Sequence, residues 1–218
     1  SVAYLLWNDL PLMMIAQRTL YAMDSFPLVA VPVFLFVGSL MNASGISTHI
    51  YRFADTAAGR LPGGLAQVNI FGSLVFSGMS GSAVADAAGI GKVIIEMMTK
   101  DGRYSRGYAA AITAASATIG PIIPPSIPMV LYALVSDTSI GYLFLGGILP
   151  GLLMGVVLMA MNSYISHKRG FGADKVVPIR EIPALTVRAF PALLMPIILL
   201  YGIYGGVTTP TEAAAVAA

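Results

Sequence analysis

Two short segments of the sequence carry residue types that bind ions and small anions. They read SGMSGS at 77–82 and GPIIPPS at 120–126, and each interrupts an otherwise apolar stretch. Glycines and prolines end helices, so backbone carbonyl groups at these segments lose their helical hydrogen bonds. Such carbonyl oxygens, together with serine hydroxyls, suit Na+, and a helix N-terminus beside them attracts a carboxylate. We predict that the two segments face each other and form one site for a cation and a carboxylate-bearing solute.

The candidate binding residues come from these two segments and from one acid and one serine close to them. They are Ser77, Gly78, Ser80, Gly81, Ser82, Asp86, Ser116, Gly120, Pro121, Ile123, Pro124 and Ser126. The expected ligands of the cation are backbone carbonyls near Ser80, Ser82, Gly120 and Ile123. Two alternatives stay open: the breaks serve only close helix packing, or Asp86 caps the returning helix instead of facing an ion.

The composition places this chain in a membrane. Hydrophobic residues make up 57% of it, charged residues make up 10%, and the mean hydropathy is +0.82. Aspartate, glutamate, lysine and arginine are absent from 25–51, 61–85, 107–136, 138–166 and 189–211. Each of these gaps can hold the ~20 apolar residues of a transmembrane helix. We predict an all-α integral membrane protein that crosses the lipid bilayer several times.

Several functional classes are excluded by what the sequence lacks. Without cysteine there is no disulfide, thiolate metal site or cysteine nucleophile. The net charge of +2 is too small for a nucleic-acid-binding surface, and His49 and His167 lie too far apart to suggest a metal centre. The run AAGIGK at 87–92 lacks the glycine and the hydroxyl that a phosphate-binding loop requires at its ends. We therefore predict neither an enzyme nor a bound cofactor.

The chain divides into three parts. In residues 1–61 the pattern of apolar and polar residues predicts an amphipathic interfacial helix, followed by scaffold-type membrane helices. Residues 62–135 contain the two interrupted elements, and residues 140–218 contain a long apolar helix, a surface helix and the start of a further repeat. The chain ends within an Ala-Val run that resembles an unfinished helix, so we expect it to be a fragment.

The middle part is predicted to contain a helical hairpin and a broken helix. The hairpin, over 63–98, has arms at Gly64–Phe76 and Val84–Met98 and turns at Ser77–Ser82, and the helix over 106–135 stops at the proline-rich segment. Basic residues flank the hairpin on both sides. By the positive-inside rule both of its ends lie in the cytoplasm, which makes the hairpin re-entrant.

Two features of the last part are also predicted from spacing. Gly147, Gly151 and Gly155 recur at four-residue steps in the long helix Ile140–Ser166, which permits close contact with a neighbouring helix. The charged segment Pro178–Arg188 predicts the surface helix.

Four motifs in order resemble the large membrane subunit of the tripartite ATP-independent periplasmic (TRAP) transporters. They are DSFPLVAVPVFLFVGSLMNASGI at 24–46, SGMSGSAVADAAGIGKV at 77–93, ITAASATIGPIIPPSIPMVLYA at 112–133 and GGVTTPTEAAAVA at 205–217. The resemblance covers nearly the whole chain, although members of the family are about twice as long.

The resemblance implies a multi-pass protein of the bacterial inner membrane that uses a sodium gradient to take up organic acids, such as C4-dicarboxylates or sialic acid. Its partners would be a small membrane (Q) subunit and a periplasmic solute-binding (P) subunit. The family is understood as an elevator built from inverted repeats, of which this chain would be one half. The hairpin 63–98 would then be the first re-entrant hairpin, and helices 26–45 and 140–166 would belong to the scaffold.

Other functions remain open from the sequence. A stand-alone sodium-coupled carboxylate symporter would have the same interrupted helices but no binding protein. A structural or assembly subunit would use the breaks for packing only. A membrane enzyme is a third alternative, for which the sequence offers no catalytic set.

Overall fold

A computed structural model of the chain describes residues 2–8, 11–23, 26–100 and 102–171, together with 190, 194, 197–198, 200–209, 212–213 and 215. Within these residues the regular structure is helical and contains no strand. The elements are α1 (Val2–Trp7), α2 (Met13–Met23), α3 (Phe26–Ala43), α4 (Ile46–Ala58), α5 (Gly64–Ser80), α6 (Ala83–Asp86), the π-helical turn η1 (Ala87–Gly91), α7 (Lys92–Lys100), α8 (Arg106–Ala117), α9 (Ile127–Ser136) and α10 (Ile140–Arg169). The all-α prediction is therefore confirmed for this part of the chain.

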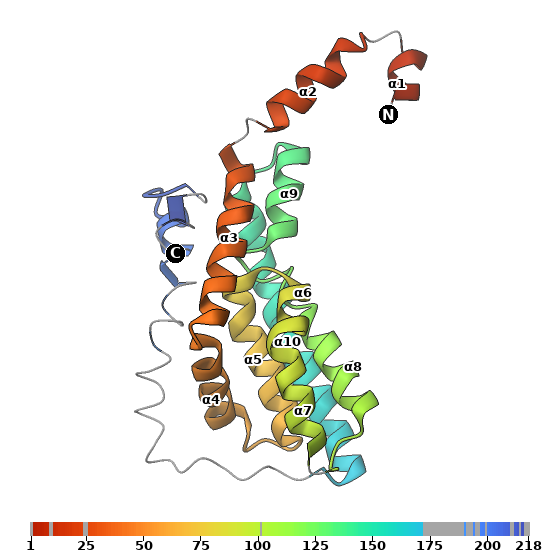
Figure 1. Cartoon of the computed structure of the whole chain (residues 1–218), viewed down its shortest axis with the longest axis vertical. Coiled ribbons are helices and arrows are strands. Elements are labelled where there is room, and N and C mark those ends of the chain that lie inside the picture. Colours follow the sequence, from red (N-terminus) through yellow and green to blue (C-terminus); the bar gives the residue numbers. More distant parts are fainter. Residues whose placement is uncertain are drawn as a thin grey trace.

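The predicted hairpin is present, but its turn is shorter than expected. Helix α5 runs to Ser80, and the chain returns through α6, η1 and α7, so that both ends of the hairpin lie at the lower end of the bundle (Figure 1). The segment Ser77–Ser80 stays helical because the N–H of Gly81 donates to the Ser77 carbonyl at 3.3 Å. Gly81 supplies the left-handed turn with φ +58°, and the Ser82 hydroxyl accepts the N–H of Ala85 to begin α6. The turn is thus Gly81–Ser82 and not the whole of 77–82.

The second interrupted element also forms as predicted. Helix α8 ends at Ala117, the chain continues irregularly through the prolines, and α9 begins at Ile127. Ser126 is extended, and its hydroxyl accepts the N–H of Met129, so it caps α9. Prolines lack the N–H that an unbroken helix would require here.

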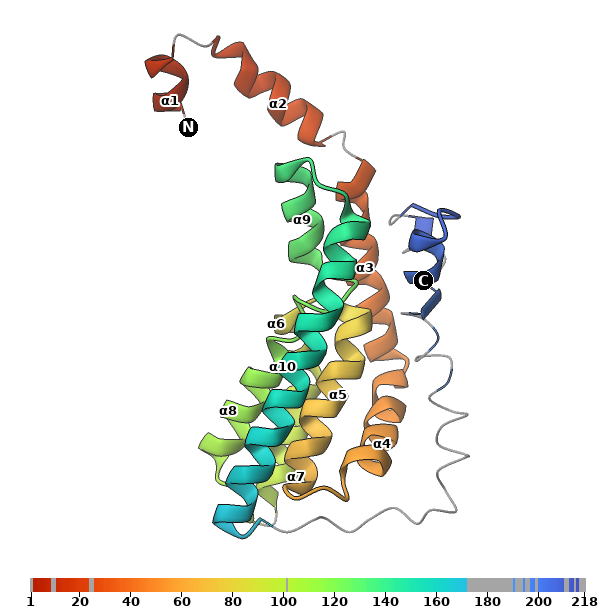
Figure 2. The same cartoon turned by 180° about the vertical axis from the view of Figure 1, so that it is seen from behind.

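Helix α10 runs along nearly the whole bundle, and in the view from behind it lies in front of the hairpin and the broken helix (Figure 2). Its three spaced glycines face these elements. A β-carbon at Gly147 would clash with the Ile122 carbonyl, one at Gly151 with the Ile123 side chain, and one at Gly155 would lie 2.8 Å from Leu74. The predicted close packing is confirmed, and its partners are α5 and the break between α8 and α9.

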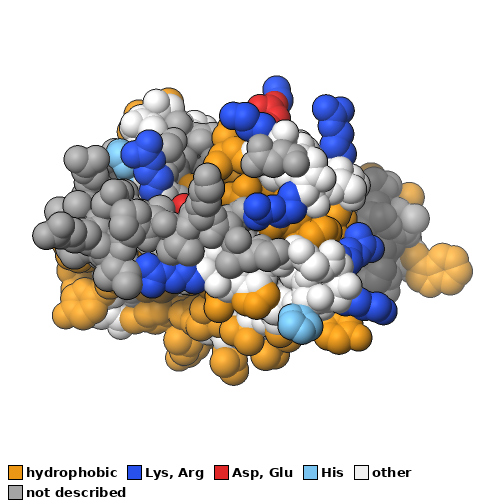
Figure 3. Space-filling model, turned by 90° about the horizontal axis from the view of Figure 1, so that it is seen from below, with side chains coloured by type: hydrophobic (Ala, Val, Ile, Leu, Met, Phe, Trp, Pro, Cys, Tyr) orange, Lys and Arg blue, Asp and Glu red, His pale blue; other side chains and the backbone are white. Residues whose placement is uncertain are grey.

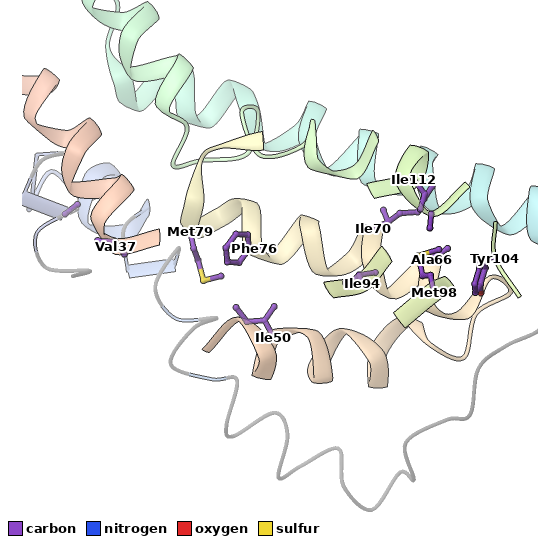
Figure 4. Packing of buried hydrophobic residues seen from close by; sticks show 12 residues of the cluster. Val37, Ile50, Ala66, Ile70, Phe76, Met79, Ile94, Met98, Tyr104 and Ile112 are labelled. Carbon is purple, nitrogen blue, oxygen red and sulfur yellow. The ribbon is translucent and has the colours of Figure 1, made fainter. Parts of the chain in front are cut away.

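The apolar core lies between the hairpin and its neighbours α3, α4 and α8. Phe76 and Met79 of α5 pack with Ile50 of α4 and Val37 of α3, while Ile70 lies near Ile112 of α8 (Figure 4). The core therefore fixes the height of the hairpin turn relative to three neighbouring helices.

Polar and aromatic contacts hold the lower end of the hairpin to α10. The Gln67 amide donates to the Met159 carbonyl at 2.9 Å and to the Ser163 hydroxyl at 2.6 Å. The Tyr104 hydroxyl donates to the Gly63 carbonyl at 2.8 Å, and that of Tyr108 to the Asn162 side chain. The start of α5, the start of α8 and the end of α10 thus form one connected base.

Lysine and arginine side chains gather over this same lower end (Figure 3). Exposed basic residues lie where α7 ends, where α8 begins and where α10 ends: Lys100, Arg103, Arg106, Lys168 and Arg169. The described part of the chain has one helix long and apolar enough to cross a membrane, α10, with shorter apolar stretches at Val31–Leu40 and Ile127–Ser136. The surface helix predicted at 178–188 lies outside the described residues.

The glycine contacts yield a test of the packing. Gly147→Ala places a methyl group against the Ile122 carbonyl and the Met129 side chain, whereas Gly146, the preceding residue, has nothing within 4 Å. We expect Gly147→Ala to destabilise the protein by about 1–3 kcal/mol, the usual cost of overpacking, and Gly146→Ala to have little effect. Thermal unfolding of the full-length protein in detergent measures both. Equal melting temperatures for the two variants would contradict the close contact.

Candidate functional site

The hairpin turn and the helix break lie in direct contact. The N–H of Ile127 donates to the Gly81 carbonyl at 3.4 Å, and a β-carbon at Gly81 would clash with the Pro125 carbonyl. On the other side of the turn, a β-carbon at Gly120 would lie 3.3 Å from the Ala83 nitrogen. The prediction that the two segments face each other is confirmed, and the absence of side chains at Gly81 and Gly120 permits it.

Several backbone carbonyls around this contact have no hydrogen-bond donor from the protein. Among the described residues, the carbonyls of Gly78, Ser80, Gly120 and Ile123 accept no hydrogen bond, which leaves oxygen atoms from both interrupted elements unpaired. Ser80, Gly120 and Ile123 are three of the four positions predicted to provide carbonyl ligands. The fourth differs, because the Ser82 carbonyl accepts the N–H of Asp86 at 3.1 Å within the returning helix.

The serine hydroxyls of the site mainly hold its backbone in shape. The Ser77 hydroxyl donates to the Leu74 carbonyl at 2.7 Å, and that of Ser80 accepts the Ser82 N–H at 3.5 Å. The Ser126 hydroxyl donates to the Pro121 carbonyl and caps α9. Pro121 therefore does not offer a free carbonyl, and Pro124 is buried beside Ser126. These hydroxyls keep lone pairs for a ligand, but their first role here is to satisfy the broken backbone.

Ser116 lies one helical turn before the break, in a polar row between α5 and α8. It accepts a hydrogen bond from Ser73 at 3.1 Å and donates to the Thr113 carbonyl at 3.0 Å, while Asn69 donates to the Thr113 hydroxyl at 2.7 Å. Asn69, Ser73 and Thr113 were not among the predicted site residues. Their signal was available, since polar residues four apart in an apolar helix lie on one face.

Asp86 of the returning helix is buried beside α5 and α4. Its side chain is 1% exposed and lies near Ser73 of α5 and Tyr51 of α4, and one carboxyl oxygen has no hydrogen-bond partner. The alternative that Asp86 caps the returning helix is wrong, because the Ser82 hydroxyl makes that contact. Tyr51 was not among the predicted residues, and nothing in the local sequence pairs it with Asp86.

The arrangement offers neutral oxygen ligands, together with helix ends that carry partial negative charge and one that carries partial positive charge. The C-termini of α5 and α8 carry partial negative charge, and the N-terminus of α9 carries partial positive charge. Where the structure describes the chain, no three His, Asp or Glu residues cluster in a way that would hold a metal ion. The chemistry of the site is therefore that of backbone oxygen atoms, which suit a weakly held monovalent cation beside an anion.

Comparison with known proteins shows the family of this chain. Residues 1–218 match the family described as "Tripartite ATP-independent periplasmic transporter, DctM component". The chain is 47% identical over 217 residues to the sialic acid TRAP transporter large permease protein SiaM of Vibrio cholerae, which covers 99% of this chain and 51% of that protein. It is 44% identical to the sialic acid TRAP transporter permease protein SiaT of Haemophilus influenzae over 93% of this chain and 33% of that protein.

A third relative is the C4-dicarboxylate TRAP transporter large permease protein DctM of Pseudomonas aeruginosa. It is 36% identical to this chain and covers all of it, but this chain spans 50% of that protein. The chain thus spans about half the length, or less, of these curated relatives. The relatives are named as permeases, which fits a transporter and not an enzyme. Because the family model matches every residue, the chain belongs to the DctM component family of the tripartite ATP-independent periplasmic transporters.

Proposed function

We propose that this chain forms half of a transporter subunit that couples Na+ entry to the uptake of an organic acid. The observation that supports the proposal is the contact between the hairpin turn and the helix break. The segments that meet there include the unpaired carbonyls of Ser80, Gly120 and Ile123, which we call the carbonyl cluster. Neutral oxygens of this kind suit Na+ as the coupling ion. Bound Na+ would contact the backbone carbonyls that have lost their helical hydrogen bonds at the breaks.

The depth of this contact supports a position inside the bilayer. Gly147 and Gly151 of α10 receive the break, and they lie near the middle of the uncharged stretch 138–166. The hairpin starts and ends at the lower, basic end of the bundle, so its turn reaches the middle of the bilayer and goes back. We therefore propose that the hairpin is re-entrant and that the basic end faces the cytoplasm of a bacterial inner membrane, by the positive-inside rule.

The organic acid is proposed from the site and from the relatives. The N-terminus of α9 beside the carbonyl cluster favours an anionic group, and the relatives carry the names of sialic acid and C4-dicarboxylate transporters. Beside the turn, the Val84 side chain on one side is 76% exposed. We propose that a second half, of the kind the longer relatives contain, covers this side and completes the solute site.

Delivery and movement follow from family membership and are proposals as well. A periplasmic solute-binding subunit would deliver the acid, and a small membrane subunit would accompany the permease. In an elevator the hairpin and the broken helix would move together. The scaffold role for 140–166 stays a prediction, although the contacts of α10 with Leu74 and Ile122 favour its movement with the hairpin.

Uptake by the full-length permease tests the function directly. With its small membrane subunit in proteoliposomes, it should accumulate sialic acid or a C4-dicarboxylate only when Na+ is outside and the binding protein is present. Replacement of Na+ by choline at equal ionic strength is the control. Uptake that needs no binding protein would favour the stand-alone symporter, and uptake that ignores Na+ would contradict the coupling.

Sodium should also stabilise the folded protein, because an ion that binds only the native state shifts the unfolding equilibrium. At 100 times the dissociation constant, the stabilisation is about 2.7 kcal/mol. Melting curves of the full-length protein in Na+ and in choline measure this effect. Identical curves would favour the alternative in which the breaks serve only packing.

The contact itself is tested by Gly81→Ala. An alanine at φ +58° would clash with the Pro125 carbonyl, whereas Gly170 has a similar φ of +72° with nothing within 4 Å. Both substitutions carry the backbone strain of the left-handed region, but only the first separates the turn from the break. We expect Gly81→Ala to weaken the sodium dependence of melting and uptake at least roughly tenfold, by loss of preorganised ligands. Gly170→Ala should keep it, and the same loss in both variants would contradict this role.

A further inference from the structure

A second group of oxygen atoms lies behind the hairpin turn, and the proposed carbonyl site does not use it. It consists of Asp86 of α6, Ser73 of α5 and Tyr51 of α4, with Asn69 one helical turn from Ser73. Asp86 and Ser73 are almost fully buried. One carboxyl oxygen of Asp86, the Tyr51 hydroxyl and the Asn69 side-chain oxygen are buried without any hydrogen-bond partner.

The fold brings these side chains together through close helix contact. A β-carbon at Gly72 would lie 2.6 Å from the Tyr51 ring, so the missing side chain at Gly72 lets α4 press its tyrosine onto α5 beside Ser73. Ser73 is held by its 3.1 Å hydrogen bond to Ser116 of α8. Asp86 approaches from the first turn of the returning helix, with Ser73 and Tyr51 as its polar neighbours.

The backbone directly after Asp86 is irregular in a way that fits a binding site. The segment Ala87–Gly91 is a π-helical turn, and its last residue packs so closely on α8 that a β-carbon at Gly91 would lie 2.6 Å from Thr113. Single π-helical turns inside α-helices are rare and often occur at functional sites. Here the extra residue in the turn sets the direction of Asp86 relative to α7.

No counter-charge faces the carboxyl group of Asp86 among the residues that the structure describes. Among the described residues that surround it, the polar neighbours are the neutral Ser73 and Tyr51, and no lysine, arginine or histidine contributes an opposite charge. Lys92, the nearest base along the chain, is exposed. A buried carboxylate without a partner is strongly unfavourable, so a native protein neutralises it with a cation or a proton.

We propose that Asp86, Ser73 and Tyr51 form a buried site for one monovalent cation, either Na+ or a proton, separate from the carbonyl cluster at the turn. A carboxylate, two hydroxyls and the amide oxygen of Asn69 are hard oxygen ligands that suit such a cation. The site joins α4 to both arms of the hairpin. The bound cation satisfies the buried oxygens that the protein leaves unpaired.

Two titrations of the full-length transporter with Asp86→Asn test this site. Melting temperature is followed against Na+ concentration at fixed pH, with choline as replacement, and against pH in sodium-free buffer. If the occupant is Na+, the melting temperature of the variant should depend less steeply on Na+ concentration than that of the wild type, by the equivalent of one bound ion. If the occupant is a proton, the melting temperature of the variant should instead depend less steeply on pH, by the equivalent of one bound proton. Unchanged slopes in both titrations would overturn the proposal.

Two further variants make the result interpretable. Glu96→Gln changes an exposed acid on the same arm to its amide and should leave both slopes unchanged. Ser73→Ala keeps the carboxylate but removes a ligand, so the midpoint of the affected titration should shift roughly tenfold with its slope unchanged. An unmoved midpoint in Ser73→Ala would overturn the proposal even if Asp86→Asn fails to fold. The carbonyl site at the turn is reported separately by Gly81→Ala, so failure of one site is distinguishable from failure of the other.

Discussion

The bundle depends on one constraint: backbone polar groups inside hydrocarbon must find partners within the protein. Two helices break in this chain, and each break helps to satisfy the other. Ser82 and Ser126 cap α6 and α9, the helices that follow the turn and the break, and the N–H of Ile127 donates to the Gly81 carbonyl. The carbonyls that stay unpaired are concentrated where these elements meet. The same constraint that makes broken helices rare in membranes is thus the reason why we propose an ion site at their contact.

Small residues allow this contact to form. Glycines in α10 admit the break, Gly81 and Gly120 allow the turn and the break to touch, and Gly72 admits the Tyr51 ring. Apolar burial alone would not fix these positions, because lipid tails surround the outer faces equally well. Packing of backbone against backbone, together with the polar row between α5 and α8, determines how the hairpin sits on its neighbours.

The features that could be predicted from the sequence are those that depend on neighbouring residues in the chain. Prolines marked the break between α8 and α9, and the four-residue glycine spacing marked the contact face of α10. The hairpin turn was placed too broadly because serine is compatible with both a helix and a turn, and only the left-handed Gly81 decides where α5 ends. The meeting of Tyr51 with Asp86 depends on tertiary packing between residues far apart in the chain, and no local pattern announces the π-helical turn beside them.

The base that joins the hairpin to α10 has a mechanical consequence. At its root the hairpin is tied by the Gln67 amide and by the Tyr104 hydroxyl, with bonds of 2.6 to 2.9 Å. At its tip the bond from Ile127 to Gly81 is long, at 3.4 Å. The hydrogen bonds at the root of the hairpin are thus shorter than the one at its tip, where apolar packing of Phe76 and Met79 also holds the chain. Small displacements of the hairpin should therefore be larger at its tip than at its root, so that the proposed ion binding at the tip would be coupled to the position of the hairpin.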